Sequence, residues 1–404
     1  MSKPVNTKIR RISLLHNGYC NLSMRVTGVS MSRISSGRRV AFEALAAVEH
    51  GAFASDSLRH LSAALDSRNA GLAAQIVFGC LRYRAQLDFL ILHYSSRHAE
   101  SLDEPVRLAL RMGIFQLRYL DRVPAHAAVH ESVELAKQHR RAASGFANAV
   151  LRKVTREPIA WPDEATGLSL PNWLLERWKE HFGSDKARRI ARAGLEEPRK
   201  YVGQTIGVLP TRFQDIGSQS IIPLLDLQPG QSYLDLCAAP GNKTLQALET
   251  PLSLAIACDI SEKRMREISR VCPLVILDAA RPLPFSRLFD RIFIDAPCSG
   301  TGTIARNPEI KWRVEPKDFG RFGEKQSRIL GHALPLLAPH GKLLYATCSL
   351  EPEENENVVR LALAEHPRLR LERSMWRLPG MDEGDGFFAA VFSVIRSSDP
   401  EAGS

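Results

Sequence analysis

The sequence predicts an all-α bundle followed by a Rossmann-like α/β domain, and two patterns carry this prediction. From about Arg38 to Arg156 apolar residues recur at helical spacing, interrupted only by short breaks. Beyond Gln231 short apolar strands alternate with helical stretches, which is typical of a mostly parallel sheet with crossover helices. A chain of 404 residues has room for two or three such domains.

The first region is predicted to contain several amphipathic helices. Ser57–Leu65 carries leucines on one face, and Pro105–Leu120 begins with a proline that suits the first turn of a helix. In the second of these segments Val106, Leu110 and Ile114 recur at helical spacing. Helices of this kind, joined by short breaks, form a compact bundle of about 120 residues.

Seven strands are predicted in the second region, and the last pair is expected to supply a late antiparallel strand. In chain order they are Tyr233–Cys237, Leu254–Asp259, Leu274–Asp278, Arg291–Asp295, Lys342–Thr347, Leu369–Arg373 and Phe387–Ile395. A short helix is predicted at Trp173–Phe182, in the join between the two regions. We predict four segments: a basic N-terminal extension over 1–34, the helical domain over 35–157, a linker with a small subdomain over 158–212, and the α/β domain over 213–398.

Positive charge is concentrated in the first part of the chain. Residues 1–160 hold 23 Lys and Arg against 12 Asp and Glu, whereas the remaining residues hold 31 against 32. Residues 1–39 alone contain eight basic residues and no acidic one. A basic end on a nearly neutral body favours a polyanionic partner such as nucleic acid. Because residues 1–30 lack any periodicity and Met31 offers a second start, we expect the extension to be disordered or not translated.

The composition also excludes several classes of protein. The sequence has no apolar run long enough to span a membrane, and no secretory signal follows its first basic residues. Its seven cysteines include no C-x-x-C pair, so neither a disulfide framework nor a zinc ribbon is expected, and we expect a reduced, cytoplasmic protein. His126 and His130 stand four residues apart, but no third ligand accompanies them, so no metal site is predicted.

The loop after the first predicted strand is a candidate ligand cradle, since ligands of parallel sheets lie beyond the carboxyl ends of the strands. Gly241 and the small residues before it allow close backbone approach, and the following helix start offers unpaired N–H groups. The loop has neither the glycine spacing of a dinucleotide site nor that of a P-loop. We therefore predict an adenosine ligand that carries an amino-acid carboxylate, with Lys243 as a charge partner. The loop residues are Cys237, Ala238, Ala239, Pro240, Gly241, Asn242 and Lys243.

Acidic residues end the next two predicted strands. Asp259 stands 24 residues after Asp235, a spacing at which a carboxylate can accept hydrogen bonds from both ribose hydroxyls. Asp278 ends the third strand, where it is placed to accept a hydrogen bond from an adenine amino group. Taken alone, each aspartate is more often a helix cap or a turn former. Ligand contact is favoured because three consecutive strands end in suitable groups: the loop after the first strand, Asp259 after the second and Asp278 after the third.

Two cysteines fall at the ends of strands that are expected to be neighbours. Cys298 follows the fourth strand and Cys348 the fifth, whereas the others are expected to be small buried apolar residues: Cys20, Cys80, Cys237, Cys258 and Cys272. A thiolate in a polar turn can act as a nucleophile if its pKa is lowered. Three acidic residues follow Cys348 closely, and their side chains are expected to point away from it: Glu351, Glu353 and Glu354.

Methyl transfer to carbon C5 of a pyrimidine needs such a thiol. Addition of a thiolate at C6 converts the ring to an enamine, whose C5 can attack a sulfonium methyl group. An acid at the ring nitrogen eases that addition, and Asp295 is placed for this role. A base must then remove the C5 proton, and a second cysteine can assist release of the first. A methyltransferase acting on an amino group would need no thiol and would carry Asn-Pro-Pro-Tyr or Asp-Pro-Pro-Tyr where this sequence has Asp-Ala-Pro-Cys.

At these residues the sequence resembles the bacterial Sun/RsmB family of 16S rRNA cytosine-C5 methyltransferases. The match rests on three motifs: Asp235-Leu-Cys-Ala-Ala-Pro-Gly-Asn-Lys243, Asp295-Ala-Pro-Cys-Ser-Gly300 and Thr347-Cys348-Ser349. It covers about Phe213 to Ile395 and implies a class I methyltransferase domain. The resemblance implies Cys348 as the nucleophile and Cys298 as the residue that promotes product release. It also implies S-adenosyl-L-methionine as the cofactor, bound by the Cys237–Lys243 loop, Asp259, Asp278 and Asp295.

The N-terminal region is similar to the NusB-like RNA-binding domain that distinguishes this family. The match rests on Leu110-Arg-Met-Gly-Ile-Phe-Gln-Leu117, Val123-Pro-Ala-His-Ala-Ala-Val129 and Gly145-Phe-Ala-Asn-Ala-Val-Leu-Arg152. The implied partner is 16S rRNA, naked or early in assembly, with no membrane or metal partner and a monomeric enzyme. The alternatives are a tRNA 5-methylcytosine methyltransferase and a non-catalytic, antitermination-like RNA-binding factor.

The sequence departs from the family pattern in two places. Asn242 stands where the family usually has a second glycine, and asparagine tolerates left-handed backbone angles. Between Pro198 and Gln219 only Lys200–Pro210 stands in for a longer subdomain, which is expected to reduce the RNA-docking surface but not the chemistry.

A basic loop with one tryptophan follows the second motif. It is expected to hold RNA by phosphate contacts and stacking, with a solvated basic loop as an equal alternative. Its residues are Arg306, Asn307, Lys311, Trp312 and Arg313.

Overall fold

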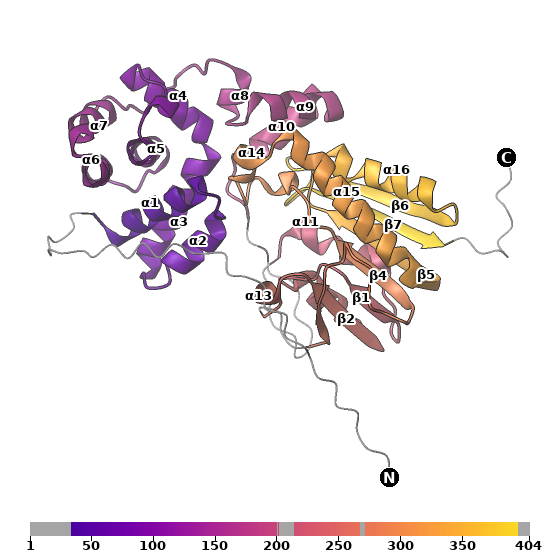
Figure 1. Cartoon of the computed structure of the whole chain (residues 1–404). Coiled ribbons are helices and arrows are strands. Elements are labelled where there is room, and N and C mark those ends of the chain that lie inside the picture. The colour runs from indigo at the N-terminus through magenta and orange to yellow at the C-terminus, as the bar shows by residue number, and fades with distance from the viewer. Residues whose placement is uncertain (1–33, 200, 202–213, 267–270, 395–404) are drawn as a thin grey trace, which may run out of the picture. The chain divides into compact units, whose positions relative to one another are not determined.

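The computed structural model describes residues 34–199, 201, 214–266 and 271–394, so residues 1–33 of the predicted basic extension lie outside it. The helical domain, indigo to purple in Figure 1, has seven α-helices among the described residues. They are α1 (Ser36–Glu49), α2 (Ala54–Leu61), α3 (Ser67–Arg82), α4 (Arg84–Ser95), α5 (Glu104–Tyr119), α6 (Ala125–His139) and α7 (Ser144–Leu151). Short 3-10 turns at Ala99–Ser101 and Arg141–Ala143 precede α5 and α7.

Helix α5 lies at the centre of the helical domain. Pro105 occupies its first turn, where a missing backbone N–H is harmless. Val106, Leu110 and Ile114, which were predicted to share a face, are buried in the domain core. The helix packs against α1, α3, α4, α6 and α7, which explains why most of its circumference is apolar.

Helix α2 ends earlier than the predicted Ser57–Leu65 segment. It spans Ala54–Leu61, and Leu65 packs on the core from the turn that follows. Ser62 is the C-cap of α2, and Asp66 caps the next helix, α3, by accepting a hydrogen bond from Asn69 N at 2.9 Å.

The linker contributes three further helices, α8 (Glu164–Gly167), α9 (Asn172–Phe182) and α10 (Ser184–Ala193). Helix α9 confirms the helix predicted at 173–182 to within one residue. Its buried side chains pack with those of α10 and with residues of the α/β domain. The segment over 200–210, predicted to stand in for a longer subdomain, lies outside the described residues apart from Tyr201.

The second region folds into a seven-stranded sheet with strand order β3-β2-β1-β4-β5-β7-β6. Strands β1 to β5 pair in parallel, whereas β7 runs antiparallel to both β5 and β6. This arrangement confirms the predicted Rossmann-like fold with its late antiparallel strand. The strands are β1 (Ser232–Asp235), β2 (Leu254–Asp259), β3 (Leu274–Ile276), β4 (Phe289–Asp295), β5 (Leu337–Thr347), β6 (Leu369–Arg377) and β7 (Phe387–Val394).

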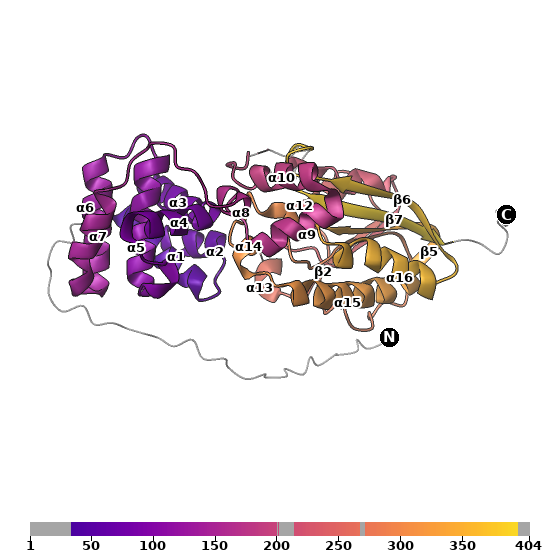
Figure 2. The same cartoon turned by 90° about the horizontal axis from the view of Figure 1, so that it is seen from above.

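Helices cover both faces of the sheet. On one face lie α15 and α16 (Figure 2). Their buried side chains pack on Leu343 and Tyr345 of β5. On the other face α12 and a 3-10 turn pack on Leu344 and Ala346. Consecutive residues of β5 thus enter opposite cores, as the two-residue period of a strand requires. The helices of this domain are α11 (Ile216–Gln219), α12 (Asn242–Ala247), α13 (Glu262–Met265), α14 (Ile310–Arg313), α15 (Pro316–Ala333) and α16 (Glu356–Glu365), with 3-10 turns at Ile222–Leu225, Thr301–Thr303, Leu334–Leu336 and Pro352–Glu354.

Strands β1 and β3 each end two residues before the predicted ends at Cys237 and Asp278. Strand β1 stops at Asp235, whose side chain accepts a hydrogen bond from Cys237 N and turns the chain. Strand β3 stops at Ile276, and Asp278 forms a similar turn through Ala280 N. Within the described part of the chain, no helix is both long and apolar enough to cross a bilayer.

Candidate active site

A cavity of about 800 Å³ opens beyond the carboxyl ends of β1 and β4. The structure therefore brings the loop after β1 and the end of β4 together, as the sequence predicted for a parallel sheet. The loop before β7 closes a further side of the cavity, which the sequence analysis missed. The lining includes Cys237, Ala238, Ala239, Pro240, Asn242, Lys243, Asp295, Asp385 and Phe387.

Asp235 holds the loop after β1 in place. Its side chain is buried and accepts hydrogen bonds from Thr244 Oγ1 at 2.7 Å and from Cys237 N at 3.3 Å. Burial raises the pKa of Asp235 to about 7. Gly241 has a φ of 102°, a left-handed conformation that favours glycine. Asn242 instead begins α12 in a helical conformation, so the left-handed tolerance expected of it is not used.

Asp259 and Asp278 lie outside the residues that line this cavity. Asp259 accepts hydrogen bonds from Ala239 N at 3.1 Å and Ser261 N at 2.8 Å, and so joins the end of β2 to the loop after β1. Asp278 accepts a hydrogen bond from Ala280 N at 3.0 Å. Both aspartates therefore shape turns, and their contacts with a ligand stay predictions.

Lys243 and Asp295 form the charged pair of the cavity. Lys243 Nζ lies 2.7 Å from Asp295 Oδ2 and 5.2 Å from the centre of the Phe387 ring. Burial lowers the pKa of Lys243, but the Asp295 carboxylate more than offsets this, and the net pKa is raised. Lys243 therefore carries a proton at neutral pH. The role of Asp295 as the acid at the nucleobase stays a prediction, and Lys243 is a second proton-bearing group at the same place.

Cys298 and Cys348 meet where β4 and β5 end. Their Sγ atoms are 3.3 Å apart, both are free cysteines, and both side chains are partly exposed. The meeting follows from the parallel pairing of the two strands, in which Asp295 lies opposite Ala346. The hydrogen bond with Cys348 and burial raise the pKa of Cys298 well above its ordinary value. Either sulfur can be the donor in this contact.

Two of the three glutamates that follow Cys348 point away from it, as predicted. Glu351 accepts hydrogen bonds from Arg177 Nε at 2.5 Å and from Trp178 Nε1 at 3.0 Å. Glu353 pairs with the same arginine. Helix α9 of the linker therefore neutralises both acids and fixes the turn that contains them.

Glu354 contradicts that expectation. Its side chain is fully buried and turns toward the residues that directly follow the two cysteines, Ser299 and Ser349. Sequence spacing could not distinguish its direction from those of its two neighbours, because all three lie in one short turn.

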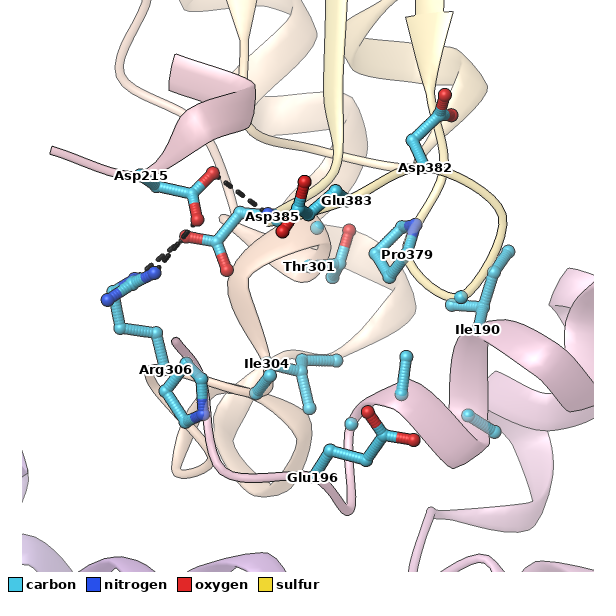
Figure 3. A pocket seen from close by; sticks show the side chains of 18 of the residues that line it. Ile190, Glu196, Asp215, Thr301, Ile304, Arg306, Pro379, Asp382, Glu383 and Asp385 are labelled. Carbon is cyan, nitrogen blue, oxygen red and sulfur yellow. Dashed lines mark hydrogen bonds and ion pairs between the residues drawn. The ribbon is translucent and has the colours of Figure 1, made fainter. Parts of the chain in front are cut away.

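Arg306 lies between two buried carboxylates, as Figure 3 shows. Its Nη2 is 2.9 Å from Asp215 Oδ2, and its Nε is 2.8 Å from Asp385 Oδ2. Burial raises the pKa of Asp385 to about 6, with Asp215 adding to the effect and Arg306 opposing it. Asn307 Nδ2 donates to Thr303 Oγ1 at 3.1 Å. The guanidinium of Arg306 is thus held by protein carboxylates between the first cavity and a second one of about 550 Å³, and the RNA contacts predicted for Arg306 and Asn307 stay predictions.

The rest of the predicted RNA loop contacts the helical domain. Lys311 is 1% exposed, and the polar ends of Trp312 and Arg313 are also bound to protein. The three donors reach backbone carbonyls of α3 and α1: Lys311 Nζ to Arg82 O at 2.8 Å, Trp312 Nε1 to Leu81 O at 2.8 Å, and Arg313 Nη2 to Val48 O at 3.0 Å. The RNA contact predicted for Lys311 is therefore corrected, because its side chain is buried against α3, whereas those predicted for Trp312 and Arg313 stay predictions.

Replacing Lys311 with methionine is expected to flatten the pH dependence of stability. Burial lowers the pKa of Lys311 well below its ordinary value, so unfolding takes up a proton at any pH between the folded and the unfolded pKa. The free energy of unfolding of the wild type should rise with pH, by up to about 1.4 kcal/mol per unit, until the unfolded pKa of about 10.4 is reached. Urea midpoints at pH 7 and 9 measure this rise. The exposed Lys186→Met is the matched control, and parallel pH dependence in wild type and Lys311→Met would contradict the assignment.

The sequence analysis missed Asp215, Asp385 and Phe387. Asp385 and Phe387 lie in the run Gly384-Asp385-Gly386-Phe387, where an acid between two glycines precedes the last strand. That pattern indicates a tight loop before a strand. The sequence analysis considered only loops that follow strands, because ligands of parallel sheets lie beyond the carboxyl ends of the strands. No local signal marks Asp215, whose partner Arg306 lies 91 residues further along the chain.

Comparison with known proteins places the chain among RNA methyltransferases. Residues 222–393 match the family described as 16S rRNA methyltransferase RsmB/F, and residues 35–156 match the NusB family. The chain is 31% identical to ribosomal RNA small subunit methyltransferase B of Cronobacter sakazakii, over 85% of this chain and 95% of that protein. It is 30% identical to the protein of the same name from Yersinia pseudotuberculosis, over 87% and 97%. The crystal structure of PH0851 shares the fold, with a TM-score of 0.72 and 21% identity over 89% of this chain and 98% of that one.

Proposed function

Starting from the family to which the chain belongs, the 16S rRNA methyltransferases RsmB/F, we propose that it methylates C5 of a cytosine in 16S rRNA through a covalent adduct with Cys348. The observation that carries the adduct is the 3.3 Å contact between the Sγ atoms of Cys298 and Cys348 at neighbouring strand ends. Methyl transfer to an amino or hydroxyl group needs no thiol nucleophile, whereas C5 of cytosine becomes nucleophilic only after addition at C6.

The residues around the larger cavity fit S-adenosylmethionine as the methyl donor. Small side chains at Ala238 and Ala239 and the left-handed turn at Gly241 leave the backbone open to a ligand. Asp259 is bound to this loop, and Asp278 forms the turn that follows β3. We assign the loop 237–243 and these two aspartates to cofactor binding. When bound, S-adenosylmethionine supplies an electrophilic methyl group to C5.

The charged pair is assigned to activation of the nucleobase. The Cys348 thiolate adds to C6, and the electron pair displaced from the ring needs a positive or proton-bearing group at the ring nitrogen. Lys243 carries that proton, and Asp295 fixes its position at 2.7 Å. The Asp295 carboxylate can also accept a hydrogen bond from the exocyclic amino group of cytosine.

Cys298 is assigned to release of the product. After methylation a general base removes the C5 proton, the C5–H electrons restore the ring double bond, and the C6–S electron pair returns to Cys348. A protonated Cys298 in contact with that sulfur donates a hydrogen bond to the departing thiolate. Lowering the energy of the leaving group in this way speeds the elimination.

The RNA itself is expected to bind across both domains. The excess of basic residues lies in the first 160 residues, which include the helical domain. The target base must enter a cavity at the sheet edge, so it has to be unpaired and out of the helical stack. Naked or early-assembly 16S rRNA meets this condition more readily than a finished subunit. Cys298, Cys348, Lys243 and Asp295 all come from one chain, which agrees with a monomeric enzyme.

Methyl incorporation on three substrates tests this proposal. Labelled S-adenosylmethionine is supplied with naked 16S rRNA, assembled small subunits or bulk tRNA, and the labelled base is mapped by mass spectrometry. We expect 5-methylcytosine at one site in naked 16S rRNA and at least about tenfold less in the other two. Preferential labelling of tRNA would contradict the assignment of 16S rRNA and identify tRNA as the substrate. Cofactor binding without incorporation into any RNA would favour a non-catalytic factor.

A further inference from the structure

One buried carboxylate lies between the two turns that carry the thiols. Glu354 is 0% exposed, and four donors satisfy its two oxygens. Oε1 accepts hydrogen bonds from Ser299 Oγ and, at 2.6 Å, from Ser349 Oγ. Oε2 accepts from Ser299 N at 2.8 Å and from Gln326 Nε2 at 3.0 Å. Because these serines directly follow Cys298 and Cys348, one side chain ties both turns together.

The surroundings of Glu354 restrict the same two turns further. Gln326 Nε2 also donates to Pro297 O at 3.0 Å, so the residues on both sides of Cys298 are held. Asn355 Nδ2 donates to Ser349 O at 2.9 Å and holds the turn after β5. The backbone carbonyl of Glu354 accepts the hydroxyl of a buried tyrosine on β5 at 2.6 Å. The carboxylate thus sits in a framework with little freedom to move.

The charge of Glu354 is not explained by stability. Its four donors are all uncharged, and burying a carboxylate without a cation costs free energy that a glutamine of the same shape would avoid. The negative charge does have an effect on the thiols, because it adds to the hydrogen bond and burial that raise the pKa of Cys298. The other titratable groups around the sulfurs are Tyr345, whose pKa burial also raises, and protonated Lys243.

We propose that Glu354 is a positioning residue of the thiol pair, which holds the Cys298 and Cys348 turns through Ser299 and Ser349 so that the two sulfurs stay in contact. Its charge keeps the shared proton on Cys298, which leaves Cys348 as the nucleophile and Cys298 as the donor to the departing sulfur. The catalytic meaning of this role rests on the proposed function, but the geometry and the protonation order can be measured without it.

The first test compares Glu354→Gln with Glu353→Gln, the same change one residue earlier at the acid bound by Arg177. We expect Glu354→Gln to lower kcat on 16S rRNA by about 10- to 100-fold, as displacement of a reacting group does. The KM for RNA and the Kd for S-adenosylmethionine should stay within twofold of the wild type. Glu353→Gln should keep its kcat within twofold, and equal kcat values for the two variants would overturn the proposal.

The second test measures the protonation of Cys298 directly. In a Cys348→Ala background the rate of iodoacetamide alkylation of Cys298 is followed against pH by peptide mass spectrometry. Adding Glu354→Gln should move the midpoint of this profile down by about one pH unit, the size of a nearby charge effect. An unmoved midpoint would overturn the charge assignment. Because no RNA is present, this result stands even if methylation of rRNA is not observed.

Ser299→Ala is a second variant that tests the positioning role of Glu354 if Glu354→Gln does not fold. It removes the hydroxyl donor and leaves Glu354 with three partners, Ser349 Oγ, Gln326 Nε2 and the backbone N–H of residue 299. We expect unchanged thermal unfolding, a kcat lowered by about fivefold or more, and more covalent protein–RNA adduct at steady state. A Ser299→Ala variant with wild-type kcat would overturn the positioning role.

Discussion

Cys348→Ala is expected to abolish methyl transfer and covalent capture of RNA together. RNA that contains 5-azacytidine has no C5 proton to lose, so an adduct formed at C6 cannot eliminate. Wild-type protein should therefore give an adduct that survives denaturing electrophoresis, whereas Cys348→Ala should give none. Loss of the nucleophile should lower kcat on 16S rRNA by at least about 10⁴-fold. Full methylation activity in Cys348→Ala would contradict the assignment of the nucleophile.

Cys298→Ala should separate formation of the adduct from its release. Without the donor at 3.3 Å, the Cys348 thiolate leaves C6 slowly, and adduct should accumulate on ordinary cytosine. The wild type should show adduct only with 5-azacytidine. Cys272→Ala, a cysteine outside the thiol pair, is the matched control and should behave like the wild type. Rapid turnover by Cys298→Ala with no trapped species would exclude a role in release.

Lys243→Met is expected to lower kcat/KM by about 10³-fold, or about 4 kcal/mol of transition-state stabilisation. The substitution removes the proton-bearing group at the nucleobase and leaves Asp295 without its partner at 2.7 Å. Lys342→Met, at an ion pair on the edge of the domain, changes the same chemical group and should cost less than twofold. Single-turnover methylation at saturating cofactor separates this effect from a change in cofactor affinity.

A double-mutant cycle checks whether Lys243 and Asp295 act as one unit. If they do, Lys243→Met with Asp295→Asn should be no worse than the more damaging single change, because the second substitution removes an unpaired charge. Additive losses would show that the two residues act independently, and would return Asp295 to the separate acid role that the sequence suggested.

Much of the fold could be predicted from the sequence because the central strands are buried on both faces. Residues 343–346 form a continuous apolar run whose alternate members enter different cores. The edge strand β6 was harder to bound. It continues to Arg377 rather than to the predicted Arg373, because residues 374–377 go on pairing with β7 as far as Arg377 opposite Phe387.

The candidate site could be predicted only where chemistry coincides with a strand end. Cys298 and Cys348 follow adjacent parallel strands, so topology alone brings them together. The partners of Arg306 and Lys311 come from distant segments, and no periodicity records which carbonyl or carboxylate will face a side chain. Basic residues beside a tryptophan look the same in sequence whether they bind phosphate or another domain.

The segment over 306–313 has a consequence for how the gene can be divided. Glu309 Oε1 accepts a hydrogen bond from Ala54 N at the start of α2, and Lys311 is enclosed by α3 of the same domain. A catalytic fragment without the helical domain would expose the ring of Trp312 and would bring the buried amine of Lys311 into water. The helical and α/β domains are therefore not interchangeable. A chimaera has to keep the segment over 306–313 together with the backbone carbonyls of α1 and α3 that it binds.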